Sequence, residues 1–295
     1  MPTEQWTVGG VSITKLVETE SWLPIGYLDE ILPRSSRAEI EALPWLRPDY
    51  VRDGETRMGI YSFLIETPRY KVVVDTGVGN SKRRARDSWN MLNTGFLDAF
   101  REVCQPEDVD AVVCTHLHVD HVGWNTHLVH GEWLPTFPNA TYHFVEQEYR
   151  HWKRYADAND SVNPVLDVAT VFGDSVRPIV DAGLVAFVEP AATIAPEVTL
   201  LPSHGHTPGH VSVLVQSLGE SAVITGDLMH SPCQFGHPDW SNIYDTDQDA
   251  AAITRQAFLE RFADTKTIVI GTHFGTPTGV LAHRDGVNFR LTPAG

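Results

Sequence analysis

The stretch THLHVDHVGWN, residues 115–125, places three histidines and an aspartate within six positions, directly behind the apolar run AVVC. In an extended or sharply turning backbone alternate residues point the same way, so His116 and His118 can share one metal ion. Asp120 and His121 follow at the point where the chain must turn. The stretch therefore predicts ligands for two adjacent metals, two imidazoles for one and a carboxylate with an imidazole for the other.

Four apolar runs of the chain are each followed by a polar residue that could bind a metal or support a ligand. KVVVDTG leads to Asp75, AVVCTHLH to His116, SAVITGD to Asp227 and TIVIGTH to His273. Runs of β-branched residues closed by Gly, Thr or Asp are typical of buried strands. Ligand sites of α/β proteins gather at the carboxyl ends of such strands, so we expect these side chains at the edge of a sheet.

The sequence predicts a single domain over residues 1–295. Apolar residues at helical spacing predict a helix over 245–264, and 92–103 and 145–154 are shorter helix candidates. The segment 21–53 is rich in proline and aromatic residues and is interpreted as an irregular cap over the active site, with a plain surface connection as the alternative.

Composition and charge restrict the class of protein. The chain has 295 residues, 42% hydrophobic and 20% charged, as in ordinary soluble proteins. It shows neither a secretory signal at its start nor an apolar run of membrane-spanning length, so we expect a cytoplasmic protein without a membrane partner. A formal charge of −16 disfavours nucleic acid. Three cysteines without CxxC spacing argue against a thiolate zinc cluster. The basic run SKRRAR, residues 81–86, is predicted as a solvated loop in preference to an anion clamp.

The ordered motifs THLHVDH, HTPGH, TGD and GTHF resemble the metallo-β-lactamase superfamily of metallohydrolases, from about Gly59 to near the C-terminus. The resemblance implies an α/β fold, the four-layer αββα sandwich, with the site along one edge of the paired sheets. It also implies a ligand set: His116, His118 and His210 for the first metal, Asp120, His121 and His273 for the second, and Asp227 as the bridge.

Further residues receive supporting roles. VVVDTG resembles an early strand of the superfamily, which implies that Asp75 orients a ligand histidine. His204 and His206 precede the ligand loop and are expected at most beside a ligand. Asp120 and His230 are the candidate catalytic residues, as proton donors to the leaving group.

The expected cofactors are two divalent ions. Zinc is favoured by the ligand types, and manganese, iron or cobalt are the alternatives. Such a pair can share a hydroxide that acts as the nucleophile.

Within the superfamily the sequence is most similar to the quorum-quenching lactonases and the methyl parathion hydrolase-like group. Lactonases commonly place a tyrosine three residues after the bridging aspartate, where this chain has His230 in TGDLMH. We predict a hydrolase of a neutral, fairly apolar ester or lactone. Phosphotriester hydrolysis is the alternative, and a metal-binding oxidoreductase or non-catalytic member is the alternative of another class. The partner is a small-molecule substrate, and a homodimer is left open.

Overall fold

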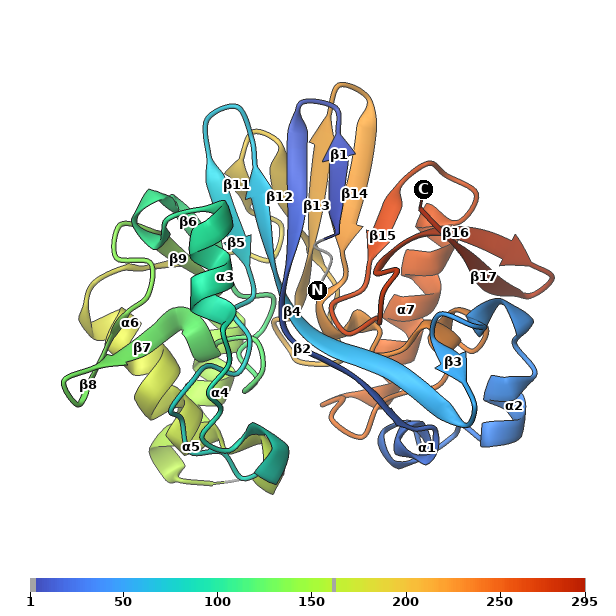
Figure 1. Cartoon of the computed structure of the whole chain (residues 1–295), viewed down its shortest axis with the longest axis horizontal. Coiled ribbons are helices and arrows are strands. Elements are labelled where there is room, and N and C mark those ends of the chain that lie inside the picture. The colour runs from blue at the N-terminus through green and yellow to red at the C-terminus, as the bar shows by residue number, and fades with distance from the viewer. Residues whose placement is uncertain (1–3, 161–162, 295) are drawn as a thin grey trace.

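The computed structural model describes residues 4–160 and 163–294, in which two β-sheets pack face to face between helices (Figure 1). The first sheet is ordered β1-β2-β4-β5-β6-β9-β10, with β3 paired to β4. Its strands are β1 (Gln5–Val8), β2 (Val11–Pro24), β3 (Val51–Arg52), β4 (Glu55–Glu66), β5 (Lys71–Val74), β6 (Ala111–Val113), β9 (Thr141–Val145) and β10 (Val185–Val188).

The second sheet runs in sequence order from β11 to β17. Its strands are β11 (Thr193–Ala195), β12 (Val198–Pro202), β13 (Val211–Ser217), β14 (Glu220–Ile224), β15 (Ile268–Ile270), β16 (Gly279–Asp285) and β17 (Asn288–Pro293). A separate hairpin is formed by β7 (Thr126–Val129) and β8 (Glu132–Pro135).

Helices cover the outer faces of both sheets. The α-helices are α1 (Gly26–Ile31), α2 (Arg37–Glu41), α3 (Phe96–Val103), α4 (Glu146–Ala158), α5 (Val168–Val171), α6 (Arg177–Asp181) and α7 (Gln248–Phe262). Short 3-10 turns lie at Pro44–Leu46, Asp87–Trp89, Pro106–Asp108, Gly123–Asn125, Pro164–Leu166, Gly226–Leu228 and Pro232–Phe235, and a π-helical turn at Phe172–Val176. None of the described helices combines the length and hydropathy that a membrane span requires.

Side-chain alternation along the strands builds the layers. In β4, Phe63 and Ile65 point into the core between the two sheets, whereas Leu64 packs on the opposite face with the residues of α3 and α4. In β13, Leu214 belongs to the outer core that Phe258 of α7 completes. Each sheet is thus apolar on both faces, which requires a helical layer on each side and confirms the predicted αββα sandwich.

The three predicted helices are present with adjusted ends. The longest begins at Gln248 because Asp247 is its N-cap, accepting the Ala250 N–H at 3.0 Å. Asp245, inside the predicted range, instead binds His206 at 2.8 Å.

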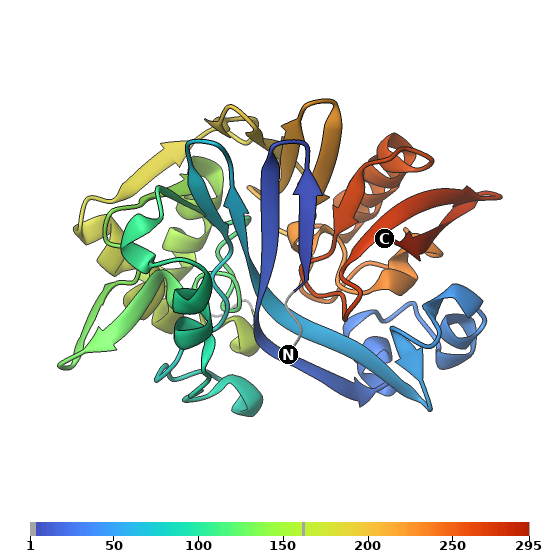
Figure 2. The same cartoon turned by 45° about the horizontal axis from the view of Figure 1, so that its top comes forward.

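Two features position the site. Strands β5, β6 and β9 are parallel neighbours, as are β14 and β15, so their carboxyl ends open to the same side. The long β2–β4 pair curves away from the rest of its sheet toward α1 and β3 (Figures 1 and 2). A bulge in this pair between Val17 and Thr19 releases Glu18, whose carboxylate accepts the N–H groups of Val78 at 2.7 Å and Gly79 at 2.9 Å in the loop after β5.

Candidate metal centre

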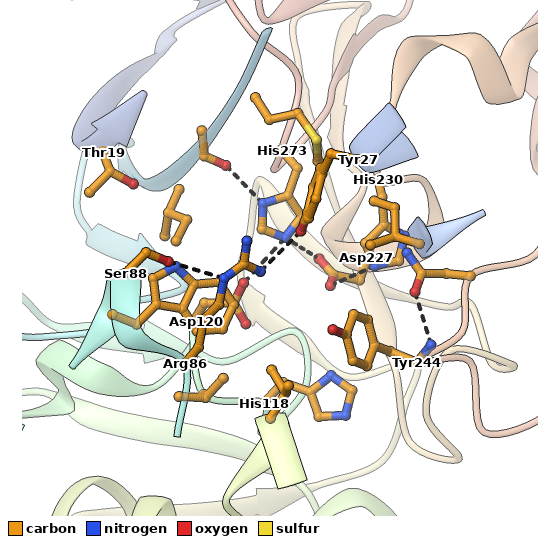
Figure 3. Close-up of a pocket in the computed structure, with 18 of the residues that line it drawn as sticks. Thr19, Tyr27, Arg86, Ser88, His118, Asp120, Asp227, His230, Tyr244 and His273 are labelled. Carbon is orange, nitrogen blue, oxygen red and sulfur yellow. Dashed lines mark hydrogen bonds and ion pairs between the residues drawn. The ribbon is translucent and has the colours of Figure 1, made fainter. Parts of the chain in front are cut away.

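Loops from several strand ends converge at one edge of the sandwich. The loop after β6 carries residues 115–121, while Asp227 follows β14 and His273 follows β15. Figure 3 shows His118, Asp120, Asp227 and His273 around a common cavity. The sheet edge predicted from the four apolar runs is therefore the place where these side chains meet.

The first group of potential ligands consists of four buried side chains whose ligand atoms lie within 4.8 Å of one another: His116, His118, His206 and Asp227. His206 Nε2 lies 3.0 Å from His118 Nδ1 and 3.4 Å from Asp227 Oδ2. His116 Nε2 lies 3.7 Å from the same carboxylate oxygen. Three imidazoles and one carboxylate form a donor set suited to zinc.

The second group consists of Asp120, His121 and His273, whose ligand atoms also lie within 4.8 Å of one another. Asp120 stands between the two rings, with Oδ1 3.7 Å from His121 Nε2 and Oδ2 3.7 Å from His273 Nε2. Its side chain is the more exposed of the three and lines the cavity.

Asp227 joins the two groups through its separate oxygens. Its Oδ1 lies 3.1 Å from His121 Nε2 and 3.0 Å from His273 Nε2. Its Oδ2 faces His116 and His206 of the first group. One oxygen directed at each group is the arrangement that a carboxylate shared by two metal ions requires.

The chemistry of these donors fits divalent cations. Among the described residues, His116 Nε2, His121 Nε2 and Asp227 Oδ1 are buried without a hydrogen-bond partner. Buried polar atoms are rarely left unpaired, and a bound cation satisfies such lone pairs. Burial also holds the pKa of His116 and of His118 well below the usual range, so both imidazoles are neutral and able to ligate at neutral pH.

Contacts behind the ligand atoms fix the second group. Asp75 Oδ2 lies 2.9 Å from His121 Nδ1, and Asp75 Oδ1 accepts the Thr115 N–H at 2.8 Å. Asp75 therefore orients a histidine of the site, as predicted. His273 Nδ1 donates to the Gly59 carbonyl at 2.8 Å, which directs its Nε2 toward Asp227.

The cavity beside these groups has a volume of about 240 Å³. His230 lines it, with Nε2 3.1 Å from Asp227 Oδ2. Burial lowers the pKa of His230, so its ring is neutral near pH 7. The apolar part of the wall consists of Leu23, Ile31, Met58, Ile60, Trp89, Val119, Val165 and Leu166.

Comparison with known proteins assigns the family. The sequence model of the metallo-beta-lactamase superfamily matches residues 56–273. The chain belongs to this superfamily. An N-acyl homoserine lactonase of Bacillus sp. is 25% identical over 174 residues, which is 54% of this chain and 58% of that relative. The lactonase AiiA of Bacillus thuringiensis subsp. kurstaki is 23% identical over 184 residues, 56% of this chain and 61% of that relative. The match thus spans about six tenths of the length of these curated relatives.

Solved structures show the same fold over nearly the whole chain. The hydrolase AbOPH of the beta-lactamase superfamily is 22% identical with a TM-score of 0.81, covering 99% of this chain and 97% of the other. AidC, a dizinc quorum-quenching lactonase in complex with a product, is 23% identical with a TM-score of 0.80, at 99% and 97% coverage.

The structure places one of the predicted ligands apart from the others. His210 lies outside both groups, because its Nδ1 lies 3.0 Å from the Ser203 carbonyl oxygen and its Nε2 accepts the Asp227 N–H at 2.8 Å. Both ring nitrogens are used by the protein. His206, four residues earlier and expected only beside a ligand, lies in the first group instead. The structure thus brings together six of the seven predicted metal ligands.

Asp245 was missed by the sequence analysis. Its Oδ1 lies 2.8 Å from His206 Nδ1, and its Oδ2 accepts the Asn242 N–H at 2.8 Å. Asp245 thus orients His206 in the same manner as Asp75 orients His121. Asp245 is the first residue of the helix predicted over 245–264, and no local pattern indicated a contact with a histidine 39 residues away.

Glu148 was also missed. It is buried on α4, where its carboxylate accepts the N–H groups of Leu117, at 3.1 Å, and Gly209, at 2.9 Å. Trp152 Nε1 donates to it at 2.6 Å. The signal available was an acidic residue one helical turn before a tryptophan on the apolar face of a predicted helix.

The prediction of a solvated loop for residues 81–86 is wrong for two of its cations. Lys82 and Arg84 are buried against Asp174 in the π-helical turn, with Arg84 Nη1 2.7 Å and Lys82 Nζ 3.4 Å from its carboxylate. Burial lowers the pKa of Lys82 to about 7, although Asp174 favours the charged form. The segment is therefore anchored to the fold rather than suspended in solvent.

The segment 21–53 contributes Leu23, Tyr27 and Ile31 to the cavity wall. Its other apolar residues, among them Leu28 and Ile40, pack in the core of the second sheet and α7. These contacts support the cap interpretation, which stays a proposal.

Proposed function

We propose that this chain is a dinuclear metal-dependent hydrolase of a neutral, fairly apolar ester or lactone. The observation that carries the proposal is Asp227, whose two oxygens face two separate ligand groups beside a cavity. We propose zinc for both sites, because imidazole and carboxylate ligands suit it. When bound, two divalent cations supply a nucleophile from water near neutral pH and polarise the substrate carbonyl.

The residues beside the two groups are placed for proton transfer. Asp120 lines the cavity, so its carboxylate is accessible to a bound substrate and we assign it the transfer of a proton to the leaving oxygen. His230 is the second candidate, since its neutral ring also lines the cavity and its Nε2 lies 3.1 Å from Asp227. A serine or cysteine nucleophile is not required.

The wall of the cavity and the relatives support the substrate class. The apolar side chains around the two groups favour an apolar acyl or alcohol arm. The curated relatives are N-acyl homoserine lactonases, and a small-molecule lactone is therefore the first substrate to test.

The test is a hydrolysis screen of the purified, zinc-loaded protein against lactones, aryl esters and a phosphotriester, with and without a chelator. We expect hydrolysis of a lactone or ester that the chelator abolishes. His118→Ala should lose bound zinc and activity together. His204→Ala is the matched control, because this neighbouring histidine is exposed and lies outside both groups. Hydrolysis that persists without metal would contradict the proposal.

The same screen covers the alternatives. Turnover of the phosphotriester alone would favour the organophosphate alternative. Iron in the purified protein together with oxygen consumption would favour the oxidoreductase alternative. A cytoplasmic location and a homodimer remain predictions, to be checked by cell fractionation and analytical ultracentrifugation.

A further inference from the structure

Arg86 brings a positive charge to the wall of the metal-site cavity (Figure 3). Its Nε donates to Ser88 Oγ at 3.1 Å and its Nη1 to the Tyr27 hydroxyl at 3.0 Å. The guanidinium also lies 4.6 Å from the centre of the Trp89 ring and 5.2 Å from that of Tyr27. A guanidinium has five N–H donors, and the described residues accept two of them. The remaining donors are available to a ligand.

In the described part of the chain, Arg86 lacks the ion pair that the two buried cations of its segment form. Lys82 and Arg84 both pair with Asp174. Over residues 4–160 and 163–294, no carboxylate oxygen lies within 4.0 Å of the Arg86 guanidinium. Asp120, on the same cavity wall, acts on the Arg86 charge without forming an ion pair. In a chain with a formal charge of −16, an arginine at a cavity wall with no ion pair among the described residues indicates a place for a ligand acceptor.

The loop that carries Arg86 is held in place before any ligand binds. Two hydrogen bonds join its two sides. The Met91 N–H donates to the Lys82 carbonyl at 2.7 Å, and the Arg84 N–H donates to Asn90 Oδ1 at 3.1 Å. The ion pairs to Asp174 fix its base. Because the guanidinium is already restrained, a ligand that binds it loses little affinity to ordering.

The chemistry of the guanidinium selects oxygen acceptors. Planar N–H donors match a carboxylate or a carbonyl oxygen, and the cation adds electrostatic attraction. In the proposed reaction the scissile carbonyl must reach the two ligand groups, so the acceptor at Arg86 is a different group of the same molecule.

We propose that Arg86, supported by Tyr27, Ser88 and Trp89, is a substrate-recognition residue that binds a second oxygen group of the substrate. This group is a carboxylate or an amide carbonyl on the arm that extends from the scissile ester or lactone. The inference rests on the proposed function and narrows its substrate class from a uniformly apolar molecule to one with an apolar part and one further acceptor.

The test measures binding, so it does not depend on turnover. The zinc-loaded protein is titrated calorimetrically with three sets of probes: monocarboxylates from butyrate to hexanoate, dicarboxylates from succinate to adipate, and the monoamides of those dicarboxylates. The first carboxylate of each probe is common to all sets. We expect the wild type to bind the best probe with a second oxygen group more tightly than the monocarboxylate of equal length.

Arg86→Met should reduce that affinity by about 10-fold to 100-fold, the loss expected for one charge-assisted hydrogen bond, and leave the monocarboxylates unchanged. Arg83→Met is the matched control, because Arg83 is exposed on the same loop. If only the dicarboxylates lose affinity, Arg86 recognises a carboxylate. If the monoamides lose affinity as well, Arg86 recognises oxygen acceptors in general. Equal affinity losses for all three sets, or no loss, would overturn the inference.

Two further measurements keep the outcomes separate. Arg86→Gln, which removes the charge and keeps an N–H donor, replaces Arg86→Met if the latter unfolds, as judged by its melting temperature. If neither lactones nor esters are hydrolysed, the proposed function fails, while the affinity difference between the probes still decides the role of Arg86.

Discussion

Replacing Glu148 by glutamine tests whether one buried carboxylate couples two loops of the metal centre. One loop carries His116 and His118 on either side of Leu117, whose N–H the carboxylate accepts at 3.1 Å. The other loop carries His206, three residues before Gly209, whose N–H it accepts at 2.9 Å. The same side chain therefore positions both parts of the first ligand group.

The magnitude follows from the hydrogen bonds. A glutamine has one acceptor oxygen where Glu148 has two, so its NH₂ group must face one of the three N–H donors, from Leu117, Gly209 or Trp152. Leaving one buried donor unpaired costs about 1–3 kcal/mol. If this cost is taken from the free energy of metal binding, the affinity of the first ligand group for its metal falls by roughly 10-fold to 100-fold.

The assay is zinc competition against a chromophoric chelator, together with thermal unfolding of the metal-loaded protein. Two zinc equivalents per chain are expected for the wild type, and Glu148→Gln should weaken one of them selectively. Glu146→Gln is the control on the same helix, because this half-exposed residue pairs only with Arg150 among the described residues. Such a pair contributes roughly 0.3–0.5 kcal/mol.

The coupling would be refuted if Glu148→Gln bound both equivalents with wild-type affinity. A loss of zinc affinity equal to that of Glu146→Gln would refute the coupling as well, because the loss would then not depend on the contacts to the two loops.

His206→Ala should remove a ligand and lower the zinc content below two equivalents per chain. His210→Ala should keep two equivalents and lose about 1–3 kcal/mol of stability, because it leaves the Asp227 N–H unpaired. Elemental analysis and denaturant unfolding distinguish the two variants, and the reverse result would support the original assignment of His210. Lys82→Met should change the pH dependence of stability. The folded-state pKa of Lys82 is lowered by burial to about 7 from 10.5, so between these values the unfolded chain binds the extra proton and the stability of the wild type rises with pH. From pH 7 to pH 9 this rise amounts to about 2 kcal/mol, and Lys82→Met should lack it in matched unfolding curves; identical curves would mean that Lys82 keeps its proton when folded.

The sequence by itself determined the family, the sandwich and the sheet edge at which the site forms. The family and the sandwich followed from the resemblance of the ordered motifs to the superfamily. The sheet edge depends on local patterns: β-branched runs produce strands, and a polar residue directly after a strand is carried to that strand's carboxyl end. His116, His118, Asp120, Asp227 and His273 were placed together for this reason. Asp75 also follows an apolar run, and the resemblance to the superfamily implied its role in orienting a ligand histidine.

Only the tertiary structure decided between His206 and His210. Both histidines belong to one short loop before β13, and their order in the motif does not state which ring faces the carboxylates. His210 directly precedes the first residue of β13, and its carbonyl accepts the Ser203 N–H at 3.0 Å, so its ring is directed to Ser203 and the Asp227 N–H. His206 remains free to point into the site.

The buried acids and cations were likewise decided by contacts distant in sequence. Glu148 lies 61 residues from Gly209, and Arg84 lies 90 residues from Asp174. A charged residue in a helix or a loop is usually solvated, and burial becomes favourable only when the fold supplies its hydrogen-bond partners. Spacing along the chain contains no record of those partners, because they are created by the packing of the two sheets and their helices.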